Sequence, residues 1–255
     1  MQIETEGVVL RQVKTLRDRL MVLLFTKKYG KISVGANQSE RSRNKASLAL
    51  RPFTHGRYEL YKTGDTYFLN GAESIQSFFK IGEDVDKYMA ASYVLEFTER
   101  LVQEEQPAIP LFDLLLDYFR LSEGRPKKHE TLLIAYLLKA IGIAGAAPQI
   151  RNCVKCGSSE APGRFSIPEG GLICKSCLAS AQQNEPLISI PEIGIMNIMN
   201  YILEHPMKQL RTLALDDEVS EKLMELLKQY ISYHFSIDHL KSESFLSSDP
   251  SNTFK

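Results

Sequence analysis

Two closely spaced pairs of cysteines, Cys153-Val154-Lys155-Cys156 and Cys174-Lys175-Ser176-Cys177, decide how the middle of this chain folds. They are all the cysteines of the 255-residue sequence. Two residues between a pair of thiolates let the chain turn so that both sulfurs face one ion. The separation of the two pairs along the chain also lies in the range typical of zinc sites. The sequence therefore predicts one zinc ion bound by four cysteines.

The residues around the cysteines favour the same interpretation. Gly157 follows the first pair, where a positive φ angle is useful. Residues 165–167 and 172–173 flank a Pro-Glu-Gly-Gly turn and predict a hairpin that delivers the second pair. Disulfides are one alternative, but nothing else in the sequence suggests secretion. A redox-active C-x-x-C motif is another, but it needs one pair and not two that face each other.

Four cysteine ligands would close the coordination shell of the ion. A catalytic zinc usually keeps three protein ligands and an open position for water. The zinc-deaminase signature also requires a His-x-Glu sequence before its cysteine pair, and this chain has none there. We therefore expect the zinc ion to be structural.

Composition and motifs give no support to an enzyme. Hydrophobic residues make up 44% of the chain and charged residues 24%, which is ordinary for a soluble globular protein. The Walker A, G-x-G-x-x-G, H-E-x-x-H and G-x-S-x-G motifs are absent. The polar N-terminus and the lack of a long uninterrupted apolar run predict a cytoplasmic protein without a membrane segment.

The net charge is zero, but the charges are distributed unevenly along the chain. Residues 1–80 contain fourteen Lys and Arg against seven Asp and Glu, so this part carries a charge of +7 and the remainder −7. A basic N-terminal part predicts a polyanionic partner at that end only.

The hydrophobic pattern divides the chain into a strand-rich and a helical part. Strands are predicted at residues 5–11, 20–26, 31–36, 53–61, 66–69 and 71–75, a number that suits a small closed barrel such as an OB-fold. Helices are predicted at about residues 83–106, 111–124, 132–145 and 191–205 and from residue 216 or 217 onward. In the first helix, Val85, Tyr88 and Leu95 mark the expected buried face.

These elements predict a multidomain α+β protein. Its expected parts are an OB-fold at 1–80, a helical domain at 81–149 and 183–246, a zinc module at 150–182 inserted between helices, and a flexible tail at 247–255.

The stretch from Lys27 to Arg57 contains eight basic residues against one acid, with Tyr29, Phe53 and Tyr58 interleaved. Cations that follow a phosphate backbone, with aromatic faces on which bases stack, are typical of proteins that bind single-stranded nucleic acid. The alternative is an ordinary barrel surface whose aromatic residues face the core.

The barrel contains residues 5–11 (TEGVVLR), 23–31 (LLFTKKYGK) and 50–53 (LRPF), and the four-cysteine insert and a C-terminal stretch at 233–246 follow. In this order, over essentially the whole chain, they resemble the RecO family of bacterial recombination mediators. The resemblance implies an OB-fold, a helical domain and a zinc module. It also implies binding to single- and double-stranded DNA, annealing of complementary strands, and a complex with RecR. That complex helps to load RecA onto DNA coated by single-strand-binding protein (SSB).

Site residues follow from the same resemblance by position. The cations implied to face DNA are Lys27, Lys28, Lys31, Arg41, Arg43, Lys45 and Arg51. The acidic C-terminal tail of SSB is implied to dock on the helical domain. Candidate cations for the tail are Arg120, Arg125, Lys127, Lys128 and Lys139. A zinc-stabilised protein–protein adaptor without direct DNA binding is the alternative function, and it would not show the steep salt dependence of a DNA binder.

Overall fold

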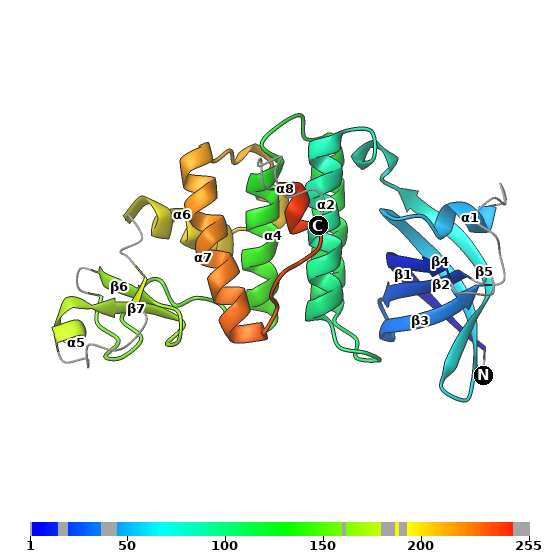
Figure 1. Ribbon diagram of the computed structural model, residues 1–255, viewed down its shortest axis with the longest axis horizontal. Coiled ribbons are helices and arrows are strands. Elements are labelled where there is room, and N and C mark those ends of the chain that lie inside the picture. Colours follow the sequence, from blue (N-terminus) through cyan, green and yellow to red (C-terminus); the bar gives the residue numbers. More distant parts are fainter. Residues whose placement is uncertain are drawn as a thin grey trace. The chain divides into compact units, whose positions relative to one another are not determined.

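The computed structural model describes residues 2–14, 20–36, 45–159, 162–179, 187–188 and 193–246 (Figure 1). The chain divides into two compact units. Unit 1 consists of Met1–Arg125 together with Leu240–Lys255, and unit 2 of Pro126–His239. The expected division by fold type into OB-fold, helical domain, zinc module and tail stays a prediction.

Unit 1 contains a closed β-barrel. Its strands are β1 (Gln2–Lys14), β2 (Leu20–Thr26), β3 (Gly30–Ala36), β4 (Thr54–Thr63) and β5 (Thr66–Ser77). They follow the order β1-β2-β3-β5-β4 around the barrel; β3 and β5 are parallel, and the other neighbours are antiparallel. The predicted closed barrel is therefore confirmed.

The two strands predicted at 66–69 and 71–75 are one strand, β5. Its register against β4 shifts between His55 and Gly56 and again between Glu59 and Leu60. At each shift β5 contains one extra residue, Ile75 and Asn70 respectively. A bulge of this kind bends a strand without ending it, and so β5 continues through the point where the sequence pattern is interrupted.

Apolar side chains fill the barrel interior, and helix α1 (Lys45–Ala49) packs against β4 and β5. The fully buried Tyr58 donates a hydrogen bond from its hydroxyl to the carbonyl oxygen of Ala49, 2.6 Å away. Ala49 and Leu50 belong to the same hydrophobic cluster as the interior of the barrel. Ala49 and Leu50, at the end of α1, therefore fix the connection between β3 and β4 to the barrel core.

Two long helices of unit 1 pack against the barrel. They are α2 (Val85–Leu101), which follows the short η1 (Phe79–Ile81), and α3 (Ile109–Gly124). Phe112 of α3 contacts Phe25 of β2 edge-on, with ring centroids 5.5 Å apart. The prediction that Val85 and Tyr88 lie on the buried face of α2 is wrong, because these side chains are 73% and 48% exposed.

The buried face of α2 runs instead through Ala90, Val94 and Phe97. These three residues are spaced four and three positions apart, as residues on one face of a helix are. The remaining described helix of unit 1 is α8 (Glu243–Leu246), which contacts α2.

Unit 2 is built on α4 (His129–Ile143), whose residues from Thr131 to Leu138 are all buried. Around α4 pack α6 (Ile193–Glu204), η2 (Met207–Thr212) and α7 (Asp217–Phe235), as Figure 1 shows for α6 and α7. The helices α3, α4, α6 and α7 therefore lie close to where the sequence predicts them. No helix among the described residues is long and apolar enough to cross a membrane.

Unit 2 also holds residues 150–179, here called the cysteine module. It contains β6 (Pro162–Ser166), β7 (Gly171–Cys174) and α5 (Lys175–Ala179); the short strand β8 (Leu187–Ile188) completes its sheet in the order β7-β6-β8. The hairpin of β6 and β7 confirms the prediction from the Pro-Glu-Gly-Gly turn. It packs on α7, where the Nε2 of His234 lies 2.7 Å from the carbonyl oxygen of Ile167.

Candidate metal centre and nucleic-acid interface

The structure brings the four cysteines together. The sulfurs of Cys153, Cys156, Cys174 and Cys177 all lie within 4.8 Å of one another. The Sγ atoms of Cys156 and Cys174 are 3.7 Å apart. In a tetrahedral zinc site with Zn–S bonds of about 2.3 Å, two sulfurs lie about 3.8 Å apart. The observed spacing therefore suits a single zinc ion.

Local structure around each pair explains how the sulfurs converge. Gly157 has a φ of 72°, as predicted, and its N–H donates to the carbonyl oxygen of Cys153 at 2.8 Å. Cys174 ends β7, and the first turn of α5 carries Cys177. Backbone N–H groups point at the sulfurs, from Cys174 to Cys153 Sγ at 3.3 Å and from Cys177 to Cys174 Sγ at 3.4 Å.

The electrostatics of the cluster favour a bound cation. Burial disfavours the thiolate of Cys153, but the backbone N–H groups of Cys174, Cys156 and Lys155 outweigh it and lower the pKa of Cys153 to about 6. The neighbouring sulfurs of Cys156 and Cys174 raise the pKa of Cys177 to about 12. Four thiolates this close repel one another unless a cation lies between them. The four sulfurs thus fit a metal ion with a closed shell.

Three of the described cations that are predicted to face DNA lie in two connections of the barrel. Lys27 and Lys28 are in the turn between β2 and β3, and Arg51 follows α1. Lys28 and Arg51 are exposed. The Nζ of Lys28 donates to the carbonyl oxygen of Glu4 at 3.2 Å, and Lys27 lies 3.7 Å from Asp113.

The remaining predicted cations differ in their position. Lys31 donates a hydrogen bond of 2.7 Å from Nζ to the carbonyl oxygen of Glu99, near the C-terminus of α2. The last carbonyls of a helix carry partial negative charge, which attracts the ammonium group of Lys31. The hydrogen bond therefore links β3 to α2. Arg41 and Arg43 lie outside the described residues. The backbone of Lys45 begins α1, and its side chain lies outside the described part as well.

The aromatic residues predicted to stack on bases face the core. Tyr58 is fully buried and Phe53 is 6% exposed. Tyr29 is partly buried and packs against the barrel interior. Phe53 instead contacts the rings of Tyr88 and Phe119 edge-on, at 5.7 Å and 5.8 Å. A stacking role is therefore wrong for Phe53 and Tyr58, and the alternative of inward-facing aromatic residues holds for them.

The five cations predicted to bind an acidic tail are divided between the units. Arg120 and Arg125 lie in unit 1, and the three lysines lie in unit 2. Arg120 pairs with Asp117 at 3.0 Å, and Arg125 is buried, which lowers the pKa of its guanidinium. The two arginines are therefore less available than their sequence positions suggest.

The three lysines of unit 2 differ in exposure. Lys127 is exposed, whereas Lys128 pairs with Asp217 at 2.7 Å. Lys139 is half-buried, and burial lowers the pKa of its ammonium. Lys127 and Arg120 are thus the two exposed residues among the five predicted tail-binding cations.

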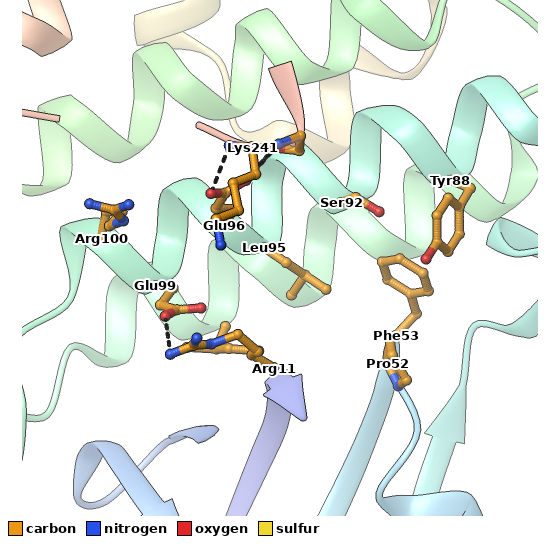
Figure 2. A pocket seen from close by; sticks show the side chains of 12 residues that line it. Arg11, Pro52, Phe53, Tyr88, Ser92, Leu95, Glu96, Glu99, Arg100 and Lys241 are labelled. Carbon is orange, nitrogen blue, oxygen red and sulfur yellow. Dashed lines mark hydrogen bonds and ion pairs between the residues drawn. The ribbon is translucent and has the colours of Figure 1, made fainter. Parts of the chain in front are cut away.

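A hollow of about 390 Å³ in unit 1 was not expected from the sequence (Figure 2). Phe53, Tyr88 and Leu95 give it an apolar side, and Arg11 and Arg100 lie at the other. Arg11 pairs with Glu99 at 3.1 Å. The hollow therefore combines cations with apolar surface beside α2.

Next to this hollow, Glu96 fixes the C-terminal segment to α2. Its carboxylate accepts hydrogen bonds from the backbone N–H of Lys241 at 2.9 Å, and from the N–H and hydroxyl of Ser242 at 2.8 Å and 2.7 Å. Burial alone would raise the pKa of Glu96, but the hydrogen bonds from Ser242 and Lys241 lower it overall. This contact gives a structural reason for the Leu240-Lys241-Ser242 sequence that contributed to the resemblance.

The fold and the site together define an α+β protein in which a barrel with a basic sequence is followed by helices that hold a four-cysteine metal-binding module. The chain belongs to the recombination protein O family. The N-terminal family model matches residues 1–78 and the C-terminal model matches residues 82–244. The family predicted from the sequence is therefore confirmed.

Three curated relatives are each named DNA repair protein RecO. The protein from Alkaliphilus metalliredigens is 33% identical over 235 residues, which cover 92% of this chain and 94% of the relative. The protein from Halalkalibacterium halodurans is 28% identical over 244 residues, covering 95% and 93%. The protein from Caldanaerobacter subterraneus is 26% identical over 243 residues, covering 95% and 96%.

Proposed function

We propose that this protein is a cytoplasmic, nucleoid-associated recombination mediator in DNA repair that works without catalysing a reaction. It binds single- and double-stranded DNA and anneals complementary strands. With RecR, it helps to load RecA onto SSB-coated DNA. The observation that carries the proposal is the closed barrel at the N-terminus, formed by a sequence with an excess of seven positive charges, which matches the N-terminal family model.

Annealing by such a protein requires charge and not a catalytic group. Two DNA strands repel each other because each is a dense line of phosphates. A basic surface that neutralises phosphates on both strands lowers this repulsion and raises their local concentration. Binding has to remain reversible, so that the duplex product is released.

Six of the predicted cations supply this surface in our proposal. They are Lys27, Lys28, Arg41, Arg43, Lys45 and Arg51. Lys31 contributes less, because its ammonium already binds the carbonyl oxygen of Glu99. Phosphate contacts of this kind do not depend on base sequence, as annealing of arbitrary complementary strands requires.

The metal in this proposal is one structural zinc ion bound by Cys153, Cys156, Cys174 and Cys177. With four protein ligands, such an ion supplies folding energy and leaves no position open for water. The N–H groups that point at the sulfurs of Cys153 and Cys174 stabilise the thiolates that the ion requires.

Annealing of two complementary oligonucleotides, one labelled with a fluorophore and the other with a quencher, tests the proposal. The wild-type protein should accelerate annealing of SSB-coated strands, and the Arg41/Arg43/Lys45→Glu variant should lose most of this acceleration. The Glu59→Gln variant is the control, because it changes an exposed residue of β4 without removing a cation. If the folded wild-type protein leaves the annealing rate unchanged, the proposal fails and the alternative of a protein–protein adaptor remains.

A further inference from the structure

Tyr61 of β4 and Phe68 of β5 form an aromatic pair on the outside of the barrel. They lie directly opposite each other in the register of the two strands, with ring centroids 5.2 Å apart and an angle of 18° between the rings. Their neighbours Leu60 and Tyr67 are buried, and side chains alternate between the two faces of a strand. Tyr61 is 41% exposed and Phe68 is half-buried. The pair therefore faces outward.

The pair continues into a row that crosses neighbouring strands. Phe68 lies beside Gly35 of β3 in the parallel register, and Gly35 lies opposite Met21 of β2. A Cβ atom on Gly35 would lie 3.2 Å from Cδ1 of Phe68 and 3.8 Å from Sδ of Met21. The absence of a side chain at Gly35 thus lets the Phe68 ring lie against the backbone of β3. We call Met21, Gly35, Phe68 and Tyr61 the aromatic row.

The aromatic row is partly exposed, and its residues are not part of the barrel core. The interior is filled by other side chains, including Leu24, Val34, Tyr58 and Leu60. Exposed aromatic surface gathered in one place on a protein is typical of a binding site. In single-strand-binding proteins, aromatic side chains on a barrel stack on successive bases whatever their sequence.

The sequence segments before β2 and after β3 contain more basic than acidic residues, with Asp18 between two arginines in the first and Glu40 before two in the second. Met21 is the second residue of β2, and Arg17 and Arg19 precede this strand. Gly35 is the second-last residue of β3, and Arg41 and Arg43 follow that strand. A single-stranded polyanion offers bases to the aromatic side chains and phosphates to a barrel whose sequence carries a net charge of +7.

We propose that the aromatic row is a platform on which unpaired bases of single-stranded DNA stack. The proposal rests on the proposed function. It assigns base stacking to Tyr61 and Phe68 in place of the buried Phe53 and Tyr58. Duplex DNA keeps its bases stacked inside the helix, so that only single strands gain this contact. Annealing therefore removes the stacking contribution, and the duplex product leaves the barrel more readily than the strands from which it formed.

The chain contains no tryptophan, and Phe68→Trp therefore introduces a unique fluorophore into the aromatic row. Its emission should be quenched by a single-stranded oligonucleotide and stay unchanged with an abasic oligonucleotide of the same length or with duplex DNA. The matched control is Tyr233→Trp, at a residue of α7 that is 59% exposed, whose emission should not respond. Equal quenching by the abasic strand or the duplex overturns the proposal.

A second measurement separates stacking from phosphate binding. Phe68→Leu and Tyr61→Leu keep an apolar side chain but remove a planar ring. Each should weaken single-strand binding by about 5- to 160-fold, the effect of losing one stacked base. The dependence of affinity on salt and the affinity for duplex DNA should not change, because no phosphate contact is lost.

Folding of these variants is checked by thermal melting, and Phe68→Tyr, which keeps a ring, should restore binding. If folded Phe68→Leu and Tyr61→Leu bind single strands as the wild type does, the aromatic row is not the platform. In that case the proposed function survives, because the wild type still binds DNA. If the wild type binds no DNA at all, the proposed function itself fails.

Discussion

Replacement of Cys174 by serine should unfold the cysteine module and leave the barrel intact. Cys174 is a buried ligand at the end of β7, and the N–H of Cys177 points at its sulfur. A serine hydroxyl is a poor zinc ligand, because zinc prefers the softer thiolate. The variant would retain three of the four proposed ligands.

The size of the effect follows from how few apolar side chains pack directly around the four cysteines, which lie beside the hairpin that α7 supports. Its hydrophobic cluster consists of Cys153, Ile173 and Cys174, with Val154 and Leu178 among the partly buried residues around it. Complete burial of a side chain such as Ile173 contributes about 1.5–3 kcal/mol. Structural zinc contributes about 10–16 kcal/mol in small zinc-binding domains, which is several times more than one such side chain. Loss of the ion should therefore unfold the module.

The assay combines zinc content with hydrogen exchange followed by mass spectrometry. Wild-type protein should contain one zinc ion per chain, and the Cys174→Ser variant should contain little. Peptides from residues 150–179 should exchange rapidly in the variant, and those from β1 to β5 should keep their protection. Lys175→Ala, at the exposed neighbouring residue, is the matched control and should behave as wild type. Full zinc content and unchanged protection in the serine variant would refute the reasoning.

Three further predictions concern other parts of the molecule. Burial lowers the pKa of His55 despite its hydrogen bond to Glu6, so the unfolded chain binds this proton more tightly than the folded one. The free energy of unfolding should thus fall as the pH decreases below about 6.5. In urea titrations across that pH range, the fall should be smaller for His55→Gln than for the wild type. An unchanged pH dependence of the free energy of unfolding in the variant would contradict a contribution of His55. Glu96→Gln should lower the free energy of unfolding by about 1 kcal/mol, because an amide replaces the charged acceptor. Hydrogen exchange at residues 240–246 should become faster. Unchanged exchange at these residues would show that Glu96 does not anchor the C-terminal segment. Lys127→Glu combined with Lys128→Glu should weaken binding of an acidic SSB-tail peptide by about tenfold or more in calorimetry; full affinity would remove these lysines as the docking site and direct the search to the hollow beside α2.

Local and periodic features of this chain could be predicted from its sequence. Coordination geometry limits the number of residues between Cys153 and Cys156, and the spacing of the cysteines alone therefore indicates the four-cysteine cluster. The positive φ of Gly157 and the β6–β7 hairpin depend on neighbouring residues and were predicted for that reason. The β-rich composition of residues 20–26 and the alternation of polar and apolar residues at 31–36 likewise located β2 and β3 within about one residue.

Features that depend on tertiary contacts could not be predicted in this way. The bulges of β5 at Asn70 and Ile75 exist only in its pairing with β4, and the sequence pattern therefore divided this one strand into two. The hydrogen bond from Lys31 to Glu99 joins residues far apart in the sequence. The inward orientation of Phe53 depends on α2 and α3, which supply the rings that it contacts.

The salt dependence of single-strand binding tests the central claim most directly. Fluorescence anisotropy of a labelled oligonucleotide should give a slope of log K against log salt of about −4, if the six proposed cations each neutralise one phosphate. The Arg41/Arg43/Lys45→Glu variant should bind more weakly, with a slope of about −2 for the three that remain. Weak, unsaturating binding by the folded wild type, or equal slopes for the two proteins, would contradict a DNA-binding surface on the barrel.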